Sequence, residues 1–319
     1  MFPGCVVGVV SSGGDREIFP FGRFTYESGS PEVREDTIYD LASITKSIPL
    51  ASLALTLIAE RNLNLNEKVK AFIPELQNDH GATVEDLLRY RVRGPRLSHL
   101  RFRTHEEIRT HVFEHGFDGP PGESEYANVP AYVLGFAVER IGGESLATLG
   151  HKYFFEPLKM ERTNFFPERS ACAPTEIQDG KVIQGIVHDE SARVFAKAGR
   201  TVGQAGLFST AGDLLNFVET LFRKSGFRKS GPGFMKSRFS VIAEGAEAGL
   251  GWEVNDGHRK SIIPKGTFGK TGFPGTSVVV DRAKGKALVI LSNRTYPRRH
   301  ADSSAINSFR CDIADIVFA

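Results

Sequence analysis

Cysteine is scarce in this chain, and its scarcity limits the environments in which the protein is expected to work. Only Cys5, Cys172 and Cys311 occur among 319 residues. An odd and sparse set of cysteines argues against a disulfide framework and fits a reducing compartment. We therefore expect a cytoplasmic protein.

A large excess of one charge is also missing. The chain has 40 Lys+Arg against 38 Asp+Glu, which gives a formal net charge of +2. A net field this small does not suggest a protein that binds nucleic acid. Hydrophobic residues make up 40% of the chain and charged residues 24%, which is ordinary globular usage and excludes a disordered or collagen-like chain.

The sequence lacks a long hydrophobic run. Its longest mostly apolar stretch, Ile48–Ala59, is interrupted by Pro49, Ser52 and Thr56. Spanning a bilayer takes about 20 apolar residues, so this stretch is expected to be a buried core helix. The apolar start Cys5–Val10 has no basic residues before it and is too short for a signal sequence, so it predicts a β-strand. We expect no membrane span.

Strand patterns lie at both ends of the chain, and helical patterns fill its middle. Alternation predicts strands at Cys5–Ser11, Glu17–Tyr26, Leu250–Val254, Gly266–Thr271, Thr276–Asp281 and Ala287–Ser292. Helical spacing predicts a helix that begins near Ser43 and ends at Asn62, followed by helices at Thr83–Tyr90, His105–His115, Val129–Ile141, Ser145–Phe155, Gly212–Arg223 and Ser303–Val317.

This order of elements predicts an α/β (α+β) fold in which one antiparallel sheet, built from both ends of the chain, is flanked by helices. Residues 1–70 and 240–319 would form the discontinuous sheet domain, and residues 71–239 an inserted, mainly helical lobe. A functional site is expected in the cleft between them.

The chemistry begins at Ser43 and Lys46, which are three residues apart at the start of a predicted helix. Side chains at i and i+3 are neighbours on a helix, and its N-terminus supplies N–H groups for a developing oxyanion. An amine can activate the hydroxyl if burial lowers the pKa of that amine. Ser-x-x-Lys also arises by chance, and serine is a common helix N-cap, so the motif does not establish catalysis alone.

Two further segments strengthen this interpretation. Tyr126 and Asn128 are two residues apart in an extended stretch, so their side chains face one side. Lys270-Thr271-Gly272 ends a predicted strand, and a lysine and a hydroxyl beside a glycine suit the binding of a carboxylate. Each segment also has an ordinary explanation, which is a surface tyrosine beside an N-cap asparagine for the first and a solvated lysine at a strand end for the second.

In this order, the three segments resemble the penicillin-recognising serine hydrolases, whose signature is S-x-x-K, then Y-x-N or S-x-N, then K-T-G. Tyr126 is similar to the class C β-lactamase and family VIII carboxylesterase branch. Further segments resemble that branch, namely Glu125–Gly135, Ala205–Leu214 and Asn293–Pro297. The resemblance covers nearly the whole chain and implies the β-lactamase/transpeptidase-like fold.

The resemblance also implies roles for individual residues. Ser43 would be acylated, and Lys46 would take or relay its proton. Tyr126 would be the partner general base, as a phenolate favoured by Lys46 and Lys270. Asn128 would hold the substrate amide or the Lys46 head.

The remaining implied residues bind substrate. The backbone N–H groups of Ser43 and Phe273 would form the oxyanion hole, next to Gly272. Lys270 and Thr271 would meet a substrate carboxylate, and Arg298 would add charge there or remain solvated. The resemblance implies no metal and no cofactor.

The chain departs from the family pattern after Asp86-Leu87-Leu88. Relatives continue T-H-T-S-G-L, whereas this chain has Arg89-Tyr90-Arg91-Val92-Arg93-Gly94. This change places several cations near the expected cleft rim. The glutamine that binds the acylamide side chain in class C β-lactamases has no assigned counterpart, which weakens a specific β-lactamase prediction.

Rival interpretations are weaker. Pro264–Thr271 resembles a P-loop, but Pro264 replaces its first glycine. His111-Val112-Phe113-Glu114-His115 fits the H-x-x-E-H zinc pattern without a third ligand, so a solvated charged helix is favoured. His188-Asp189-Glu190 predicts a surface turn or, less strongly, a cleft-lining loop. The absence of G-x-S-x-G argues against an α/β-hydrolase.

The sequence therefore predicts a serine hydrolase that uses an acyl-enzyme. Its partner would be a small ester, β-lactam or D-amino-acid peptide substrate. The alternative is a penicillin-binding sensor or pseudoenzyme that is acylated without turnover. No oligomeric state follows from the sequence.

Overall fold

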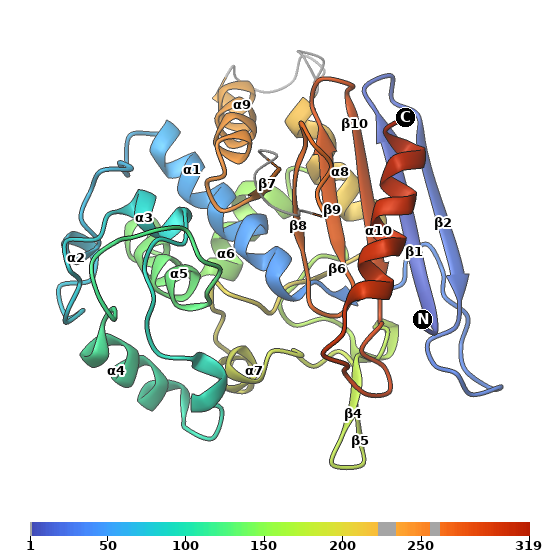
Figure 1. Cartoon of the computed structure of the whole chain (residues 1–319), viewed down its shortest axis with the longest axis horizontal. Coiled ribbons are helices and arrows are strands. Elements are labelled where there is room, and N and C mark those ends of the chain that lie inside the picture. The colour runs from blue at the N-terminus through green and yellow to red at the C-terminus, as the bar shows by residue number, and fades with distance from the viewer. Residues whose placement is uncertain (1, 223–233, 256–261) are drawn as a thin grey trace.

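Both ends of the chain contribute to a six-stranded antiparallel sheet (Figure 1). The computed structural model describes residues 2–222, 234–255 and 262–319. The strand order is β2-β1-β10-β9-β8-β7, with β1 at Gly4–Ser11, β2 at Arg16–Gly22, β7 at Glu253–Val254, β8 at Phe268–Thr271, β9 at Ser277–Asp281 and β10 at Lys286–Ser292. Strand β1 pairs with β10 from Cys5 opposite Ser292 to Ser11 opposite Lys286. The predicted sheet is confirmed.

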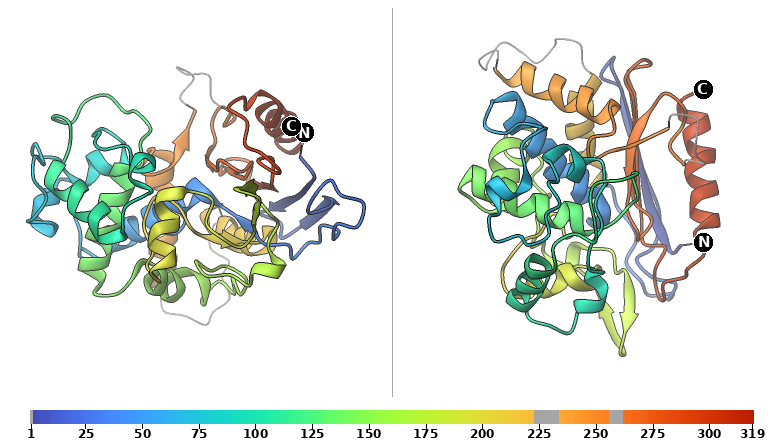
Figure 2. Two further views of the ribbon diagram at one scale, coloured as in Figure 1. Left: turned by 90° about the horizontal axis from the view of Figure 1, so that it is seen from below. Right: turned by 60° about the vertical axis from the view of Figure 1, so that its left-hand side comes forward.

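The two faces of the sheet bury different side chains. Along β1, Val6 and Val10 belong to the main core with α8 (Ala211–Phe222), whereas Val7 belongs to a smaller core under α10 (Ser304–Val317). Successive side chains of a strand point to opposite faces, so near-continuous apolar strands indicate a sheet covered on both sides. Figure 2 shows the resulting layers, with α10 outside the sheet and the other helices on its inner side.

The middle of the chain is mainly helical. Its helices are α1 (Ser52–Ala59), α2 (Val69–Phe72), α3 (Val84–Leu88), α4 (His105–His115), α5 (Val129–Gly142), α6 (Leu146–Gly150), α7 (Glu190–Lys197) and α9 (Phe234–Glu247). Short 3₁₀ or π turns occupy Ala42–Lys46, Ser47–Ala51, Leu97–Leu100, His151–Phe155 and Arg169–Ala171. Two small strand pairs complete the fold, β3 (Tyr39–Asp40) with β6 (Phe208–Ser209) and β4 (Glu176–Gln178) with β5 (Lys181–Ile183).

Helix α4 shows how local sequence sets an element's bounds. Thr104 caps the helix by accepting a hydrogen bond from the Glu107 N–H, and the Glu107 side chain returns to the Thr104 N–H. This reciprocal pair is a capping box. Gly116, with a φ of 72°, follows the last helical residue. The predicted helix at His105–His115 is therefore confirmed at both ends.

The helix predicted near Ser43 is less regular than its periodicity suggested. The segment Ala42–Ala59 contains a 3₁₀ turn and a π turn, and Ile48 departs from helical geometry before α1 begins. This segment is the one helix among the described residues that is long and apolar enough to cross a membrane, and 83% of it is buried inside the fold.

Helix α8 belongs to the sheet layer although it lies between residues 71 and 239. Its Leu215 packs on Gly8 of β1, where a Cβ would come within 3.1 Å of the leucine side chain. Division of the chain into a sheet domain at 1–70 and 240–319 and a helical lobe at 71–239 stays a prediction. The packing of α8 indicates that a boundary before residue 211 describes the layers better.

Candidate active site

Ser43, Lys46 and Tyr126 meet at one point. Lys46 Nζ lies 3.0 Å from Ser43 Oγ, and the Tyr126 hydroxyl lies 2.6 Å from the same oxygen. Ser43 and Lys46 share the turn Ala42–Lys46, whereas Tyr126 lies in the loop before α5. A hydroxyl with two proton-exchanging groups in hydrogen-bond reach suits nucleophilic catalysis. The structure thus brings together the three residues predicted as catalytic.

The turn that carries Ser43 begins with a strained residue. Ala42 has a φ of 45°, a left-handed conformation that costs a residue with a Cβ about 1–2 kcal/mol. The end of β8 packs directly on this turn, because a Cβ at Gly272 would lie 2.4 Å from the Leu41 carbonyl oxygen. Only glycine permits that approach. Gly272 therefore allows the Lys270-Thr271-Gly272 segment to lie beside Ser43.

Lys46 is buried in an environment that favours its neutral form. Burial lowers the pKa of its amine from 10.5 to about 7, while the negative charges of Asp189 and Glu253 oppose the shift. Lys46 Nζ also donates to the Gln204 carbonyl oxygen at 2.6 Å, which fixes the amine beside Ser43. A substantial fraction of Lys46 is therefore unprotonated near neutral pH and can accept the Ser43 proton.

Tyr126 differs from the sequence-based expectation in its protonation. Burial raises the pKa of the phenol, and this effect exceeds the opposing effects of Lys270 and of the hydrogen bond to Ser43. The two lysine amines lie over the ring face, Lys46 Nζ at 5.2 Å and Lys270 Nζ at 4.6 Å from its centroid. The direction of this shift favours the neutral phenol over the phenolate predicted from the sequence, although 53% of the Tyr126 surface is exposed.

Glu253 is a residue of the site that the sequence analysis missed. Its Oε1 accepts from Lys270 Nζ at 2.6 Å, and the Thr271 hydroxyl lies 3.2 Å from its Oε2. Strand β7 places it there, because Glu253 pairs with Gly269 on the neighbouring strand β8. A carboxylate of the protein thus occupies the two groups that were predicted to bind a substrate carboxylate. The strand predicted at Leu250–Val254 contains Glu253, but the pairing that places its side chain beside Lys270 is tertiary and has no local sequence signal.

A cavity of about 520 Å³ opens beside Ser43. Of the predicted residues, those that line it are Ser43, Tyr126, Asn128, Thr271, Gly272 and Phe273. Arg298 was also predicted to lie here, but it is exposed, and Arg294 and Arg299 line the cavity in its place. Arg299 turns inward because its guanidinium pairs with Glu176 at 2.6 Å and with Glu190 at 2.8 Å. Of the two alternatives predicted for Arg298, added charge or a solvated side chain, its exposure agrees with the second.

Two backbone N–H groups beside the cavity have no hydrogen-bond acceptor in the part of the chain that the structure describes. In the described part of the chain, neither the N–H of Ser43 nor that of Phe273 makes a hydrogen bond. Both residues line the cavity. Paired N–H donors next to a nucleophile can stabilise the oxyanion of a tetrahedral intermediate. This arrangement fits the predicted oxyanion hole.

Asn128 lines the cavity without making the contact expected with Lys46. It occupies the N-cap position of α5, yet its side chain makes no capping hydrogen bond. The Lys46 amine is held by the Gln204 carbonyl and not by Asn128. Two roles were predicted for Asn128, contact with the Lys46 amine or with a substrate amide. Because Lys46 bonds to Gln204 instead, the geometry is compatible with the second role.

A second hollow of about 1080 Å³ adjoins the first. The two share Tyr126, Glu253, Ile262, Thr271 and Asn307. The segment that departs from the family pattern contributes Arg89, Tyr90 and Arg91 to its wall, so it lies at the cleft rim as predicted. The Arg89 guanidinium pairs with Glu85 at 2.6 Å, so part of the positive charge is balanced within the wall.

The histidine predictions have different outcomes. His188 is 3% exposed and lines the cavity, so the favoured surface turn is wrong for this residue. The rings of His111 and His115 lie 6.3 Å apart on α4, and His115 Nε2 faces Asp118 at 2.8 Å. Among the described residues, no three histidine, cysteine or acidic side chains form a group that could hold a metal ion.

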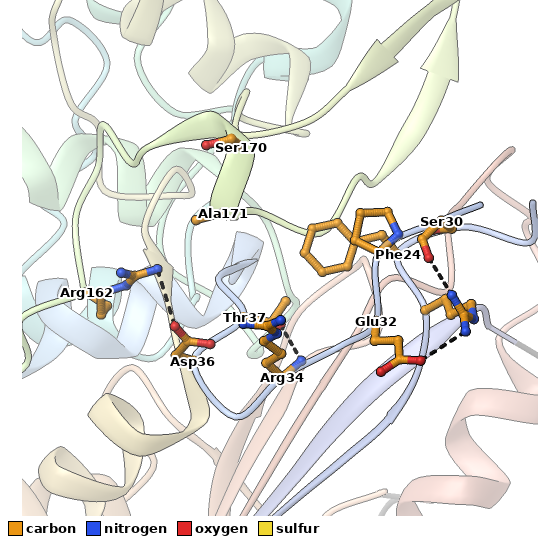
Figure 3. Close-up of a pocket in the computed structure, with 11 residues that line it drawn as sticks. Phe24, Ser30, Glu32, Arg34, Asp36, Thr37, Arg162, Ser170 and Ala171 are labelled. Carbon is orange, nitrogen blue, oxygen red and sulfur yellow. Dashed lines mark hydrogen bonds and ion pairs between the residues drawn. The ribbon is translucent and has the colours of Figure 1, made fainter.

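Another hollow, of about 480 Å³, lies away from Ser43 around Thr37 and Ala171. Figure 3 shows its charged side chains, among which Arg162 faces Asp36 at 4.0 Å and Arg23 pairs with Glu32 at 3.0 Å. These pairs balance one another at the surface. Catalytic chemistry is therefore assigned to the cavity beside Ser43.

Comparison with known proteins gives relatives along most of the chain. A putative D-alanyl-D-alanine carboxypeptidase of Escherichia coli K12 is 27% identical over 307 residues, which cover 82% of this chain and 70% of the relative. An N-acetylmuramyl-L-alanine amidase of Bacillus subtilis 168 is 24% identical over 345 residues, which cover 92% of this chain and 78% of the relative.

A β-lactamase crystal structure from Sulfitobacter sp. EE-36 shares the fold, with a TM-score of 0.76 and 19% identity over 99% of this chain and 93% of that chain. The family model described as Beta-lactamase matches residues 2–309. Because this match spans nearly the whole chain, the protein belongs to the Beta-lactamase family.

Proposed function

We propose that the protein is a serine hydrolase that cleaves a small ester or amide through an acyl-enzyme on Ser43. The observation that carries the proposal is the position of Ser43 Oγ, within 3.0 Å of Lys46 Nζ and 2.6 Å of the Tyr126 hydroxyl. Family membership and the names of the relatives support a hydrolase of this class.

In the acylation step, neutral Lys46 accepts the Ser43 proton as Ser43 Oγ attacks the substrate carbonyl carbon. The negative charge that develops on the carbonyl oxygen is stabilised by the N–H groups of Ser43 and Phe273. The bond from the carbonyl carbon to the leaving group then breaks. Tyr126 gives a proton to the leaving group and regains one from Lys46.

In the deacylation step, water attacks the ester carbonyl carbon of acylated Ser43. A basic group of the Lys46–Tyr126 pair takes the water proton, and the same pair returns a proton to Ser43 Oγ as the ester bond breaks. The products are a carboxylic acid and free enzyme, so atoms and protons balance without a cofactor.

Substrates with a carboxylate near the scissile bond form the more specific part of the proposal. Lys270 and Thr271 support it, because they present an amine and a hydroxyl at the adjoining second hollow. Glu253 occupies both groups in the resting site, so a substrate carboxylate would have to displace it or bind next to it.

The test is intact mass measured over time with a p-nitrophenyl ester and, separately, with a penicillin. We expect an adduct on the wild-type protein that forms and then disappears as product accumulates. Ser43→Ala should give neither adduct nor product, and undiminished turnover by that variant would refute the proposal. A stable adduct without turnover would favour the alternative of an acylated sensor.

A further inference from the structure

Asp40 is a buried carboxylate that connects two walls of the cavity. It is 1% exposed and lies on β3, three residues before Ser43. Its Oδ1 accepts the N–H of Ala42 at 2.7 Å, and its Oδ2 accepts the N–H of His188 at 2.7 Å. One carboxylate therefore holds both the strained turn before Ser43 and the loop that carries His188.

His188 continues this connection to the other wall. Its ring stacks on the Phe273 ring, with centroids 5.5 Å apart and planes at 22°. Its Nε2 lies 3.1 Å from Glu176 Oε2, and Glu176 in turn pairs with Arg299. The imidazole is thus fixed on its edge by a carboxylate and on its face by an aromatic ring.

Arg294 also contacts Phe273. Arg294 Nε donates to the Phe273 carbonyl oxygen at 3.1 Å, and the Arg294 guanidinium lies 5.2 Å from the ring centroid. The candidate oxyanion-hole N–H of Phe273 therefore belongs to a residue whose ring contacts both His188 and Arg294. Its position depends on both neighbours.

We propose that Asp40 and His188 form a positioning pair that sets the distance between the two donors of the oxyanion hole. Asp40 fixes the Ser43 N–H through Ala42, and His188 fixes the Phe273 N–H through ring stacking. The two donors come from distant parts of the chain, and the pair adds a side-chain connection to the backbone contact between Gly272 and Leu41. The inference rests on the proposed function, because it concerns the same reaction.

Asp40→Asn tests the pair with almost no change in volume. Asparagine offers one acceptor oxygen and one NH₂ donor, so one of the two backbone N–H groups would face a donor. Removing an oxyanion donor lowers kcat by about 10²–10³-fold, and we expect displacement of a donor to lower it by about 10- to 100-fold. KM for a p-nitrophenyl ester should change by less than about threefold, because the oxyanion exists only in the transition state.

A boronic acid that forms a tetrahedral adduct with Ser43 provides a second readout. Its affinity for Asp40→Asn should fall by the same factor as kcat/KM, since both depend on the oxyanion donors. The matched control is Asp213→Asn. Asp213 is also a buried carboxylate that accepts a backbone N–H, from Arg162 at 2.8 Å, but it does not line the cavity. The Asp213→Asn variant should have a lower melting temperature than the wild type and an unchanged kcat per titrated active site.

Two variants at His188 keep the inference testable if Asp40→Asn does not fold. His188→Phe retains a ring on Phe273 and the backbone N–H to Asp40, so we expect kcat within about threefold of wild type. His188→Ala removes the ring and should lower kcat by about tenfold. Equal kcat in these two variants would overturn the proposal, as would an unchanged boronate affinity in Asp40→Asn.

Failure of the proposed function would look different. It would appear as a wild-type protein that Ser43-directed esters and boronates do not modify, and that result would overturn both ideas. An active wild type with unaffected variants would overturn the positioning pair alone.

Discussion

Glu253 Oε1 lies 2.6 Å from Lys270 Nζ, so the cation at the end of β8 already has a carboxylate partner within the protein. Lys270 is 1% exposed, and its partner is partly exposed to the cleft. Removing a charge from either partner would change which substrates the site prefers. This relationship gives the first prediction.

Glu253→Gln should free Lys270 for a carboxylate on the substrate. We expect kcat/KM for a substrate with a free carboxylate, divided by kcat/KM for its methyl ester, to rise about tenfold, the effect of one charge-assisted hydrogen bond of about 1.5 kcal/mol. Paired kinetics on the two substrates measures this ratio. Glu247→Gln is the control, because Glu247 pairs with Arg282 outside the cavity.

Lys270→Ala should act in the opposite direction and remove the preference for the carboxylate. If it lowers kcat/KM for the acid and for the methyl ester equally, the substrate carboxylate is not bound by Lys270. The specific part of the proposed function would then be wrong, while ester hydrolysis itself would stand.

The rate should depend on pH through Lys46. Burial lowers its pKa to about 7, so the amine is charged below that pH and neutral above it. Because the neutral amine accepts the Ser43 proton, kcat/KM should rise as pH increases through about 7. A pH profile with a chromogenic ester measures this limb, and a flat profile from pH 5 to 9 would contradict it.

Lys46→Arg gives the matching variant for this pH dependence. Arginine is positively charged at every pH of the assay, so it cannot serve as a base. We expect turnover to fall by about 10²-fold or more and the ascending limb near pH 7 to disappear. Retention of that limb would assign it to another group.

Tyr126→Phe should separate substrates by their leaving groups. The variant keeps the ring that Lys46 and Lys270 contact and removes the hydroxyl beside Ser43. A p-nitrophenolate leaves without a proton, whereas an aniline requires one. We expect kcat to fall about 10²-fold more for a p-nitroanilide than for a p-nitrophenyl ester with the same acyl group. Equal losses would remove Tyr126 from leaving-group protonation.

The three cysteines should differ in reactivity. Burial raises the thiol pKa of Cys5 and of Cys172 to about 12, whereas Cys311 on α10 is partly exposed. Thiolates react with disulfide reagents, so the native protein should release about one equivalent from such a reagent quickly and three after denaturation. Cys311→Ser should abolish the fast equivalent, and its persistence would place the reactive thiol elsewhere.

Local sequence patterns predicted many helices and strands, because the spacing of apolar residues within a segment is itself set by the geometry of that element. Helical spacing predicted α4, whose start the capping box of Thr104 and Glu107 fixes in the structure, and strand patterns predicted β1, β9 and β10. The small elements β3, β6 and β7 were not predicted at their bounds. For β3 and β6, two residues give no periodicity and tertiary pairing determines them, whereas β7 lies within the strand predicted at Leu250–Val254.

The motifs also predicted which residues surround Ser43. Desolvation and tertiary pairing determine the features of the site that the sequence did not predict. The protonation of Tyr126 depends on desolvation, which a sequence does not display. Arg299 was not predicted, and it lies at the cavity because it pairs with Glu176, which is distant in the chain. Glu253 entered the site through its pairing across β7 and β8.

The pairing of β1 with β10 has a consequence for synthesis of the protein on the ribosome. Strand β1 is synthesised well before β10, the strand that pairs with it on the side toward the rest of the sheet. Until β10 is made, the apolar strand β1 has only β2 as a hydrogen-bonded neighbour. The sheet that places Lys270 of β8 near Ser43 is then incomplete. The nascent chain therefore becomes competent for chemistry late, and it must be kept from aggregating until that point.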